Sequence, residues 1–286
     1  MCNMRWFLCV GVVLCAAGCS DNRVQSTPNP SDKWVTYRQG SGGGTAEVVA
    51  AGTGWATLKG RFVLDGAAPS LQPVSASGVA ICKDHPIPNE SLVVGSNGGV
   101  KNIIVYARRV SRIHEDYLTD EWKNKEVKFD QIKCIFTSHV VALQTGQTLM
   151  VSNSDQVGHN TNISPPGDVG INPLFSVGQP PLPYSFNKAQ NTPVAVSCNI
   201  HPWMRSYILP RKDPYFAVTD DQGNFEIKNI PAGEKVEFLV WHESAPKVQG
   251  AAGDLKVNGN FSVTIAENET KDVGDIKVPA SSFNVK

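Results

Sequence analysis

Apolar and polar positions alternate along several short stretches of this chain, and turn residues separate the stretches. Residues 56–69 alternate in this way up to a turn at Gly66. Residues 100–110 form a β-branched run that follows Gly98 and Gly99. Alternation with period two, or a short β-branched run bounded by glycines, is typical of strands. We therefore predict a strand in each stretch.

The second half of the chain carries most of the strand pattern. Further strands are predicted in six stretches: residues 139–153, 192–198, 205–209, 215–243, 261–265 and 275–278. Within the longest of these, turns ending at Gly223 and Gly233 predict two hairpins. Only residues 111–125 are predicted to form a helix, a short one, and residues 164–183 are a Pro/Gly-rich excursion. Because no stretch with helical period is long enough for a βαβ unit, the chain is predicted to be all-β.

The composition limits the partners. The chain has 286 residues, enough for one large or two modest domains. Its 26 Lys and Arg residues balance its 26 Asp and Glu residues, so no long-range field attracts nucleic acid or an acidic substrate. We expect no nucleic-acid partner.

The N-terminus has the pattern of a targeting segment. Arg5 precedes an apolar run over residues 6–17, which is too short to span a membrane as a mature helix and is typical of a secretory signal. The run ends in Ala-Ala-Gly-Cys, so residues 1–18 resemble a bacterial lipoprotein signal and Cys19 would be the lipidated residue. Most such signals carry Leu where this chain has Ala16. The alternative is plain secretion after cleavage at a small-residue site.

A tether is predicted next. Residues 19–54 are polar, with prolines and a run of three glycines, and are expected to behave as a flexible coil. The chain is thus expected in the bacterial cell envelope, either periplasmic and lipid-anchored or secreted. Ser20 mildly favours the outer membrane by its resemblance to lipoprotein sorting signals.

The seven cysteines differ in their expected roles. Three lie within the signal and Cys19 would carry lipid, which leaves Cys82, Cys134 and Cys198. An odd number in an oxidising compartment indicates one special thiol. We expect Cys82 and Cys134 to form a structural disulfide, which would contribute on the order of 4 kcal/mol in the chain-entropy model. The alternative is a second metal site, because Cys82 and His85 have Cys-x-x-His spacing.

The heptapeptide CNIHPWM carries the most specific chemistry of the chain. It places a thiolate (Cys198), an imidazole (His201) and a thioether (Met204) in one tight loop, which Pro202 stiffens. Zinc seldom takes a thioether, whereas soft sulfur suits Cu(I). Two histidines with a cysteine and a weak axial methionine form the blue-copper electron-transfer site. His159 is the upstream candidate for the second histidine.

Residues 127–212 resemble a cupredoxin, closest to amicyanin and pseudoazurin in the ligand loop. The loop matches in its spelling, Cys-x-x-His-Pro-aromatic-Met. The pattern that leads to the first copper histidine is matched by six residues: Phe136, Gly146, Asn153, Asp155, His159 and Asn160. This resemblance implies a Greek-key β-sandwich that holds one type 1 copper ion.

The resemblance also implies the ligands. His159 and His201 would bind copper through an imidazole nitrogen, and Cys198 through its thiolate. Met204 would be the axial ligand. No open position would then remain for a substrate, in contrast to catalytic metal sites.

The same resemblance implies roles for three residues next to the ligands. Asn160 would hydrogen-bond toward the Cys198 loop. Gly158 would offer its carbonyl as a distant fifth ligand. Trp203 would lie near the exposed edge of His201, which is the usual electron port of such proteins.

The flanks resemble a carboxypeptidase-regulatory-like, transthyretin-type β-sandwich. The similar residues are 60–63 and 65–66 at its opening, and 223–227 and 231–233 in its closing half. This fold says little about function. Taken together, the chain resembles bacterial proteins labelled methylamine-utilisation-like.

The two resemblances imply a split domain. The sandwich would comprise residues 55–126 and 213–282, with the copper-binding segment between them. The strands predicted near 56–64 and 100–110 have an alternative assignment, in which they complete the cupredoxin instead.

We expect an electron carrier rather than an enzyme, with a redox partner such as a cytochrome or a dehydrogenase and a lipid anchor at a membrane. The alternative is a structural or ligand-binding envelope module in which copper is stored or incidental. A third reading, a copper oxidase or nitrite-reductase-like enzyme, needs a second copper cluster from the remaining histidines: His85, His114, His139 and His242. We expect His139 in the core or behind the ligands, His242 to be structural, and His114 to be exposed.

Overall fold

The computed structural model describes residues 52–76, 80–83 and 86–285. They belong to one compact unit. Strands joined by turns dominate it, so the all-β prediction is confirmed. None of the helices in the described residues is both long and apolar enough to cross a membrane. The predicted signal, Cys19 and nearly all of the predicted tether lie outside the described residues.

The flanks of the chain form two sheets. The first contains, in spatial order, β15 (Asn224–Pro231), β1 (Trp55–Asp65), β20 (Thr270–Pro279), β17 (Gln249–Ala252) and β18 (Leu255–Asn258). The second contains β14 (Phe216–Val218), β2 (Ile104–Ala107), β16 (Lys235–Trp241) and β19 (Asn260–Thr264). β1 runs parallel to β20 and antiparallel to β15. We call these two sheets the flank sandwich.

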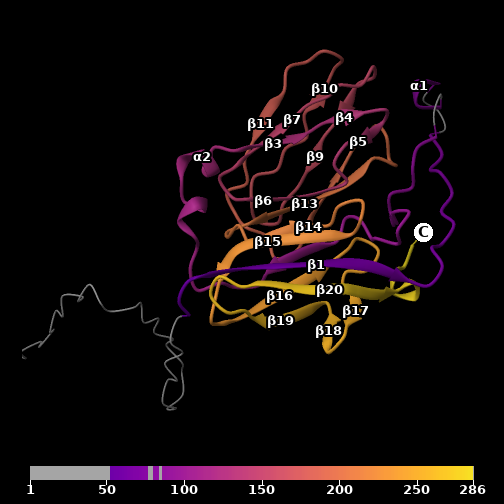
Figure 1. Ribbon diagram of the computed structural model, residues 1–286. Helices are drawn as coiled ribbons and strands as arrows, with labels where there is room; N and C mark the ends of the chain where they lie inside the picture. The colour runs from indigo at the N-terminus through magenta and orange to yellow at the C-terminus, as the bar shows by residue number, and fades with distance from the viewer. Residues whose placement is uncertain (1–51, 77–79, 84–85, 286) are drawn as a thin grey trace, which may run out of the picture. The chain divides into compact units, whose positions relative to one another are not determined.

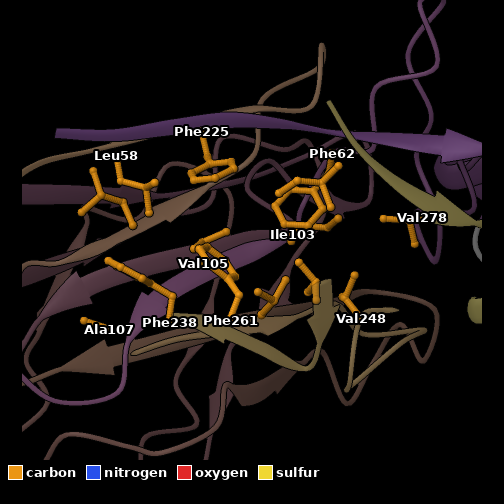
Figure 2. Close-up of a cluster of buried hydrophobic side chains, with 14 of the residues drawn as sticks. Leu58, Phe62, Ile103, Val105, Ala107, Phe225, Phe238, Val248, Phe261 and Val278 are labelled. Carbon is orange, nitrogen blue, oxygen red and sulfur yellow. The ribbon is translucent and has the colours of Figure 1, made fainter. Parts of the chain in front are cut away.

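One apolar core lies between the two sheets. Buried and less buried residues alternate along β16, as expected for a strand with one face in a core. Figure 2 shows side chains from both sheets, among them Leu58, Phe62, Val105 and Phe238, meeting in this core. Burying each such side chain contributes about 1.5–3 kcal/mol, so this core fixes the sandwich.

The middle of the chain is inserted between two neighbouring strands of the flank sandwich. β2 and β14 are hydrogen-bonded partners, with Tyr106 opposite Phe216. Residues 108–215, which we call the insert, therefore leave and re-enter the sandwich at adjacent points. β1 and β2 pair with strands of the flank sandwich, so neither strand completes the insert.

The insert has sheets and a core of its own. One sheet contains β6 (Val140–Gln144), β13 (Arg205–Arg211), β12 (Val194–Ser197) and β9 (Asn162–Ile163). Another contains β11 (Leu182–Tyr184), β7 (Thr148–Val151) and β3 (Glu126–Phe129). Two short pairs complete it: β10 (Leu174–Phe175) with β8 (His159–Asn160), and β4 (Gln131–Ile132) with β5 (Ile135–Phe136). Its core includes Phe129, Leu149 and Ile208. In Figure 1 these strands form a group separate from the strands of the flank sandwich.

The two parts share a second apolar cluster. All four residues of β2 are buried. Val105 and Ala107 face the core of the flank sandwich, whereas Ile104 and Tyr106 pack with Val140 and other residues of the insert. Burial on both faces explains why the sequence of β2 is a continuous apolar run instead of an alternating one.

The prediction that these two turns form hairpins was wrong. The turn at Gly223 joins β14 to β15, and the turn at Gly233 joins β15 to β16, so each turn crosses from one sheet to the other. Both turns exist where they were predicted, and both glycines have positive φ. A turn pattern marks where the chain reverses but does not say which sheet the next strand joins.

The predicted helix is two separate short turns of helix. Residues 111–125 contain η1 (Glu115–Tyr117) and α2 (Asp120–Lys123), and α1 (Ala80–Lys83) and η2 (Ala280–Ser282) lie elsewhere. Thr119 interrupts the segment, because its backbone is extended and its Oγ1 caps α2 by accepting a hydrogen bond from the amide of Trp122. The prediction that His114 is exposed was wrong. Its side chain is 16% exposed and lies edge-on to Trp55.

Candidate metal centre

Three of the predicted ligands come from one closed loop. β12 and β13 form a hairpin whose last pair is Ser197 and Arg205. At the base of the loop the amide of Cys198 donates to the carbonyl of Met204 at 3.2 Å. Within the loop the amide of Met204 donates to the carbonyl of His201 at 2.9 Å. The loop is therefore held by backbone hydrogen bonds, with Pro202 exposed in its middle.

The fourth predicted residue approaches this loop from another strand. His159 lies in β8, where it is paired with Phe175 of β10. The Nδ1 of His159 is 2.8 Å from the Nδ1 of His201. The Nδ1 of His201 is in turn 3.7 Å from the Sγ of Cys198. Ligand atoms of the two histidines and Cys198 all lie within 4.8 Å of one another. The fold thus brings these three side chains to one point.

All four side chains are buried. His159 has no exposed surface, and Cys198, His201 and Met204 are at most 2% exposed. Cys198 and Met204 belong to the same apolar core as Phe175 and Val196. Cys198 is the free cysteine of the described residues. The donor atoms are therefore shielded from bulk water.

Asn160 holds the ligand loop against β8. Its Oδ1 accepts hydrogen bonds from the amides of Asn199 at 2.8 Å and Ile200 at 3.3 Å, and from the Sγ of Cys198 at 3.3 Å. Its Nδ2 donates to the Oδ1 of Asn199 at 2.9 Å. This is the contact that the family resemblance implied for Asn160. Gly158 directly precedes β8, and its role as a fifth ligand stays a prediction.

Asp155 orients the ring of His159. The Nε2 of His159 donates to the Oδ2 of Asp155 at 2.9 Å. A proton on Nε2 leaves the lone pair on Nδ1, which is the nitrogen that faces His201 and Cys198. Asp155 is itself held by the side chain of Asn153, whose Oδ1 accepts from its amide at 3.0 Å. The sequence pattern contained Asp155, but its role was not predicted.

The charges of the site are coupled. Burial raises the pKa of the Cys198 thiol, but hydrogen bonds from His159 and from the surrounding backbone outweigh burial and hold this pKa below its ordinary value. Burial lowers the pKa of His159, yet Cys198 and Asp155 raise it above its ordinary value. Burial, followed by the charge of His159, lowers the pKa of His201. These contacts make the Cys198 thiol easier to deprotonate than an ordinary cysteine, and the thiolate is the form that binds metal.

The environment of His201 differs from the prediction. The resemblance implied an exposed imidazole edge, but His201 is only 2% exposed. Trp203 lies beside it with ring centroids 5.2 Å apart, and the indole packs against the apolar cluster around Cys82 and Cys134. The contact between Trp203 and this cluster joins residues distant in sequence, so the loop sequence alone does not predict it.

Cys82 and Cys134 form a disulfide with a Cα–Cα distance of 5.8 Å. This is the pairing expected from the sequence. The sulfur of Cys82 is therefore not free for the alternative metal site, and His85 lies outside the described residues. Ligand atoms of Cys134, Asp155 and His159 also lie within 4.8 Å of one another, but the sulfur of Cys134 is bonded to Cys82.

The other histidines lie elsewhere. His139 is buried in an ion-paired cluster with Glu90 and Glu243, which the sequence did not predict. His242 is 1% exposed and packs against Phe283, in agreement with a structural role. The partners of His139 come from distant parts of the chain, so no local pattern could have indicated them.

Comparison with known proteins gives matches of structure alone. No protein-family model and no curated protein matches the chain. A reduced amicyanin mutant is 17% identical, with a TM-score of 0.27, and the match covers 37% of this chain and 98% of amicyanin. A purple cupredoxin from Nitrosopumilus maritimus is 20% identical, with a TM-score of 0.23, over 27% of this chain and 82% of that chain. We draw no conclusion about function from matches at these TM-scores.

Proposed function

We propose that this chain is a type 1 copper protein that carries electrons in the bacterial cell envelope. One copper ion would be held by His159, Cys198 and His201, with Met204 as the axial ligand. The observation that carries the proposal is the convergence of two Nδ1 atoms and one free thiol at a single buried point.

The donor set fits copper. Metal–nitrogen bonds of about 2.0 Å to both histidines are compatible with nitrogen atoms 2.8 Å apart. Two imidazoles and a thiol at one point, with a buried thioether in the same loop as the thiol, fit the set that copper takes in electron-transfer sites. Asp155 bonds to the far nitrogen of His159, so it supports this ligand and does not compete as one. When bound, copper would supply a one-electron redox couple.

The chain's own residues would keep this centre unchanged between redox states. The amides of Asn199 and Ile200 and the Sγ of Cys198 are tied to Asn160, which restrains the thiol. Asp155 restrains the ring of His159. Because both restraints come from the protein's own side chains, little rearrangement would accompany a change of charge, and burial would keep water away from the ligands.

The surroundings of the carrier are also proposed. A lipid on Cys19 and a tether over residues 19–54 would hold the protein at a membrane, with the outer membrane mildly favoured. A cytochrome or a dehydrogenase would be its redox partner. The charge balance of the chain gives no reason to expect nucleic acid.

Copper titration tests the proposal. Adding Cu(II) to the mature protein is expected to give an intense thiolate-to-copper charge-transfer band at one copper per chain. Cys198→Ala should abolish the band, because the thiolate is its origin. His114→Gln, which changes a histidine outside the centre, should leave it intact. A colourless wild type, or a coloured Cys198→Ala variant, would refute the proposal.

One observation favours a second candidate, a copper-storing envelope module. His201 is only 2% exposed, so it lacks the exposed edge through which exchange would be fast. Storage predicts slow electron self-exchange and copper retention that survives Met204→Leu. An electron carrier predicts rapid exchange with its partner and a reduction potential that changes in the same variant. Self-exchange measured by NMR line broadening, together with a redox titration, separates the two functions.

A further inference from the structure

The peptide unit of Cys134 contacts the supports of both histidines. It lies in the two-residue turn between β4 and β5, outside the ligand loop and outside β8. Its amide and its carbonyl each form one hydrogen bond to a side chain next to the centre. Its sulfur bonds to Cys82. No part of the proposed ligand set includes this residue.

The amide side supports His159. The N–H of Cys134 donates to the Oδ2 of Asp155 at 2.6 Å. The same oxygen accepts from the Nε2 of His159 at 2.9 Å. Asp155 is only 8% exposed, so both hydrogen bonds are shielded from water. Displacement of this amide would therefore change the position of the oxygen that orients His159.

The carbonyl side supports the ligand loop. The Nε1 of Trp203 donates to the carbonyl of Cys134 at 3.0 Å. Trp203 stands between His201 and Met204 in sequence, and its ring lies beside that of His201. The position of the Cys134 carbonyl thus limits the rotation of the indole and, with it, the path of the loop.

The turn that presents this peptide unit is strained. Lys133 and Cys134 have φ values of 53° and 58°, a left-handed conformation that residues with a side chain adopt at a cost. Surrounding contacts must hold such a turn. Here Cys82 does so through the disulfide, and both sulfur-bearing residues are buried with Ile87 and Ala76.

We propose that Cys134 is a positioning residue for the metal centre and that its disulfide to Cys82 fixes the geometry of both histidines. This inference rests on the proposed function. Without the disulfide, the strained turn would relax, and Asp155 and Trp203 would each lose a fixed hydrogen-bond partner. His159 and His201 would then sample several orientations, and the metal-free site would no longer be pre-formed.

The Cys82→Ala/Cys134→Ala double variant tests the inference. We expect Cu(II) to bind about 10–100-fold more weakly, as is typical when the support of a metal ligand is removed. The reduction potential and the copper hyperfine splitting should change as well. Val278→Ala is the matched control, because it weakens a core residue of the flank sandwich that lies outside the centre. The control should keep the wild-type potential and spectrum.

A second variant and a metal-free measurement cover the case in which the double variant does not fold. Trp203→Phe keeps an aromatic ring beside His201 but removes the donor to Cys134, and it should also change the potential and the spectrum. In the metal-free wild type, NMR should find His159 protonated at Nε2. In the double variant His159 should show a mixture of tautomers.

The outcomes separate this inference from the proposed function. A wild type without the charge-transfer band refutes the proposed function. A coloured wild type whose potential, spectrum and copper affinity are unchanged in both the double variant and Trp203→Phe refutes the positioning role alone. If the double variant does not fold, an unchanged Trp203→Phe is sufficient to refute it.

Discussion

At the residue scale, a single amide oxygen holds much of the ligand loop. The Oδ1 of Asn160 accepts from two backbone amides of the loop and from the thiol of Cys198. Asn160 is 6% exposed, so water cannot replace it without a rearrangement. The bond from Cys198 is buried and the two amide bonds are partly buried. A buried donor that loses its acceptor costs about 1–3 kcal/mol, so this contact stabilises the loop.

Asn160→Ala is therefore expected to lower the free energy of unfolding of the metal-free protein by about 2–3 kcal/mol. Urea unfolding measures this change. Asn258→Ala, at an exposed position in β18, is the control and should change the free energy by less than about 0.5 kcal/mol. Equal effects of the two substitutions would show that the amide of Asn160 does not hold the loop.

Local spacing and the family resemblance indicated the three residues that the fold brings together, His159, Cys198 and His201. Cys198, His201 and Met204 occur in one heptapeptide whose chemistry is specific, and the pattern before His159 indicated the remaining histidine. The support from Cys134 was not predictable, because it depends on how closely the β4–β5 turn approaches Asp155 in the folded chain. The burial of His201 was not predicted either.

At the element scale, the turn at Gly223 sets how closely two segments of the flank sandwich approach. Its φ is +80°, and a Cβ atom there would lie 2.3 Å from the carbonyl oxygen of Phe62 and 2.9 Å from the Cα of Gly99. Gly253 also has a positive φ, +55°, but a Cβ atom there would meet nothing within 4 Å. The two glycines differ in the space around them and share the left-handed backbone.

Gly223→Ala should therefore destabilise the protein more than Gly253→Ala. The left-handed backbone alone costs about 1 kcal/mol at either position. The contact with the backbone of Phe62 should raise the loss at Gly223 to about 3 kcal/mol or more, because overpacking adds roughly 1–3 kcal/mol. Thermal and urea unfolding of the two variants measure the difference. Equal losses would mean that the neighbouring backbone yields at no cost.

The strand prediction was reliable where apolar periodicity was strong, but it did not predict which strands pair with one another. Period two locates β1, β15 and β16 but does not say that β15 and β16 lie in different sheets. The all-β class follows from short strands and turns alone. The pairing of β2 with β14 depends on contacts between residues far apart in the chain, which one sequence does not display.

At the scale of the whole molecule, two buried histidines respond to pH in opposite directions. Burial lowers the pKa of His139, but hydrogen bonds and charges from Glu243 and Glu90 outweigh burial and raise this pKa to about 9. Burial lowers the pKa of His242 to about 4. The groups that face His139 are Glu90, Glu243, His242 and Tyr207. Together they connect the insert to the flank sandwich.

Stability is expected to be greatest near pH 6.5, the ordinary pKa of histidine. The contribution of His139 is complete below pH 6.5 and is lost as the pH rises through about 9. The contribution of His242 is complete above pH 6.5 and is lost as the pH falls through about 4. Each amounts to on the order of 3 kcal/mol, at about 1.4 kcal/mol per pKa unit.

Unfolding free energies measured between pH 4 and pH 9 check this expectation. His139→Gln should flatten the decline above pH 6.5, and His242→Gln should flatten the decline below it. A His139→Gln variant whose stability falls with pH in parallel with the wild type would show that the two carboxylates do not hold the proton on His139.

The parallel pairing of β1 and β20 has a mechanical consequence. These two strands lie side by side, with Phe62 opposite Ile276. A force that pulls on the chain before β1 and after β20 would act along both strands in opposite directions. It would load all the hydrogen bonds between them at the same time instead of one after another. The insert branches from β2 and returns through β14, away from this line of force. In a protein pulled at both flanks, the relative positions of His159 and Cys198 would thus stay unchanged until the β1–β20 pair ruptures.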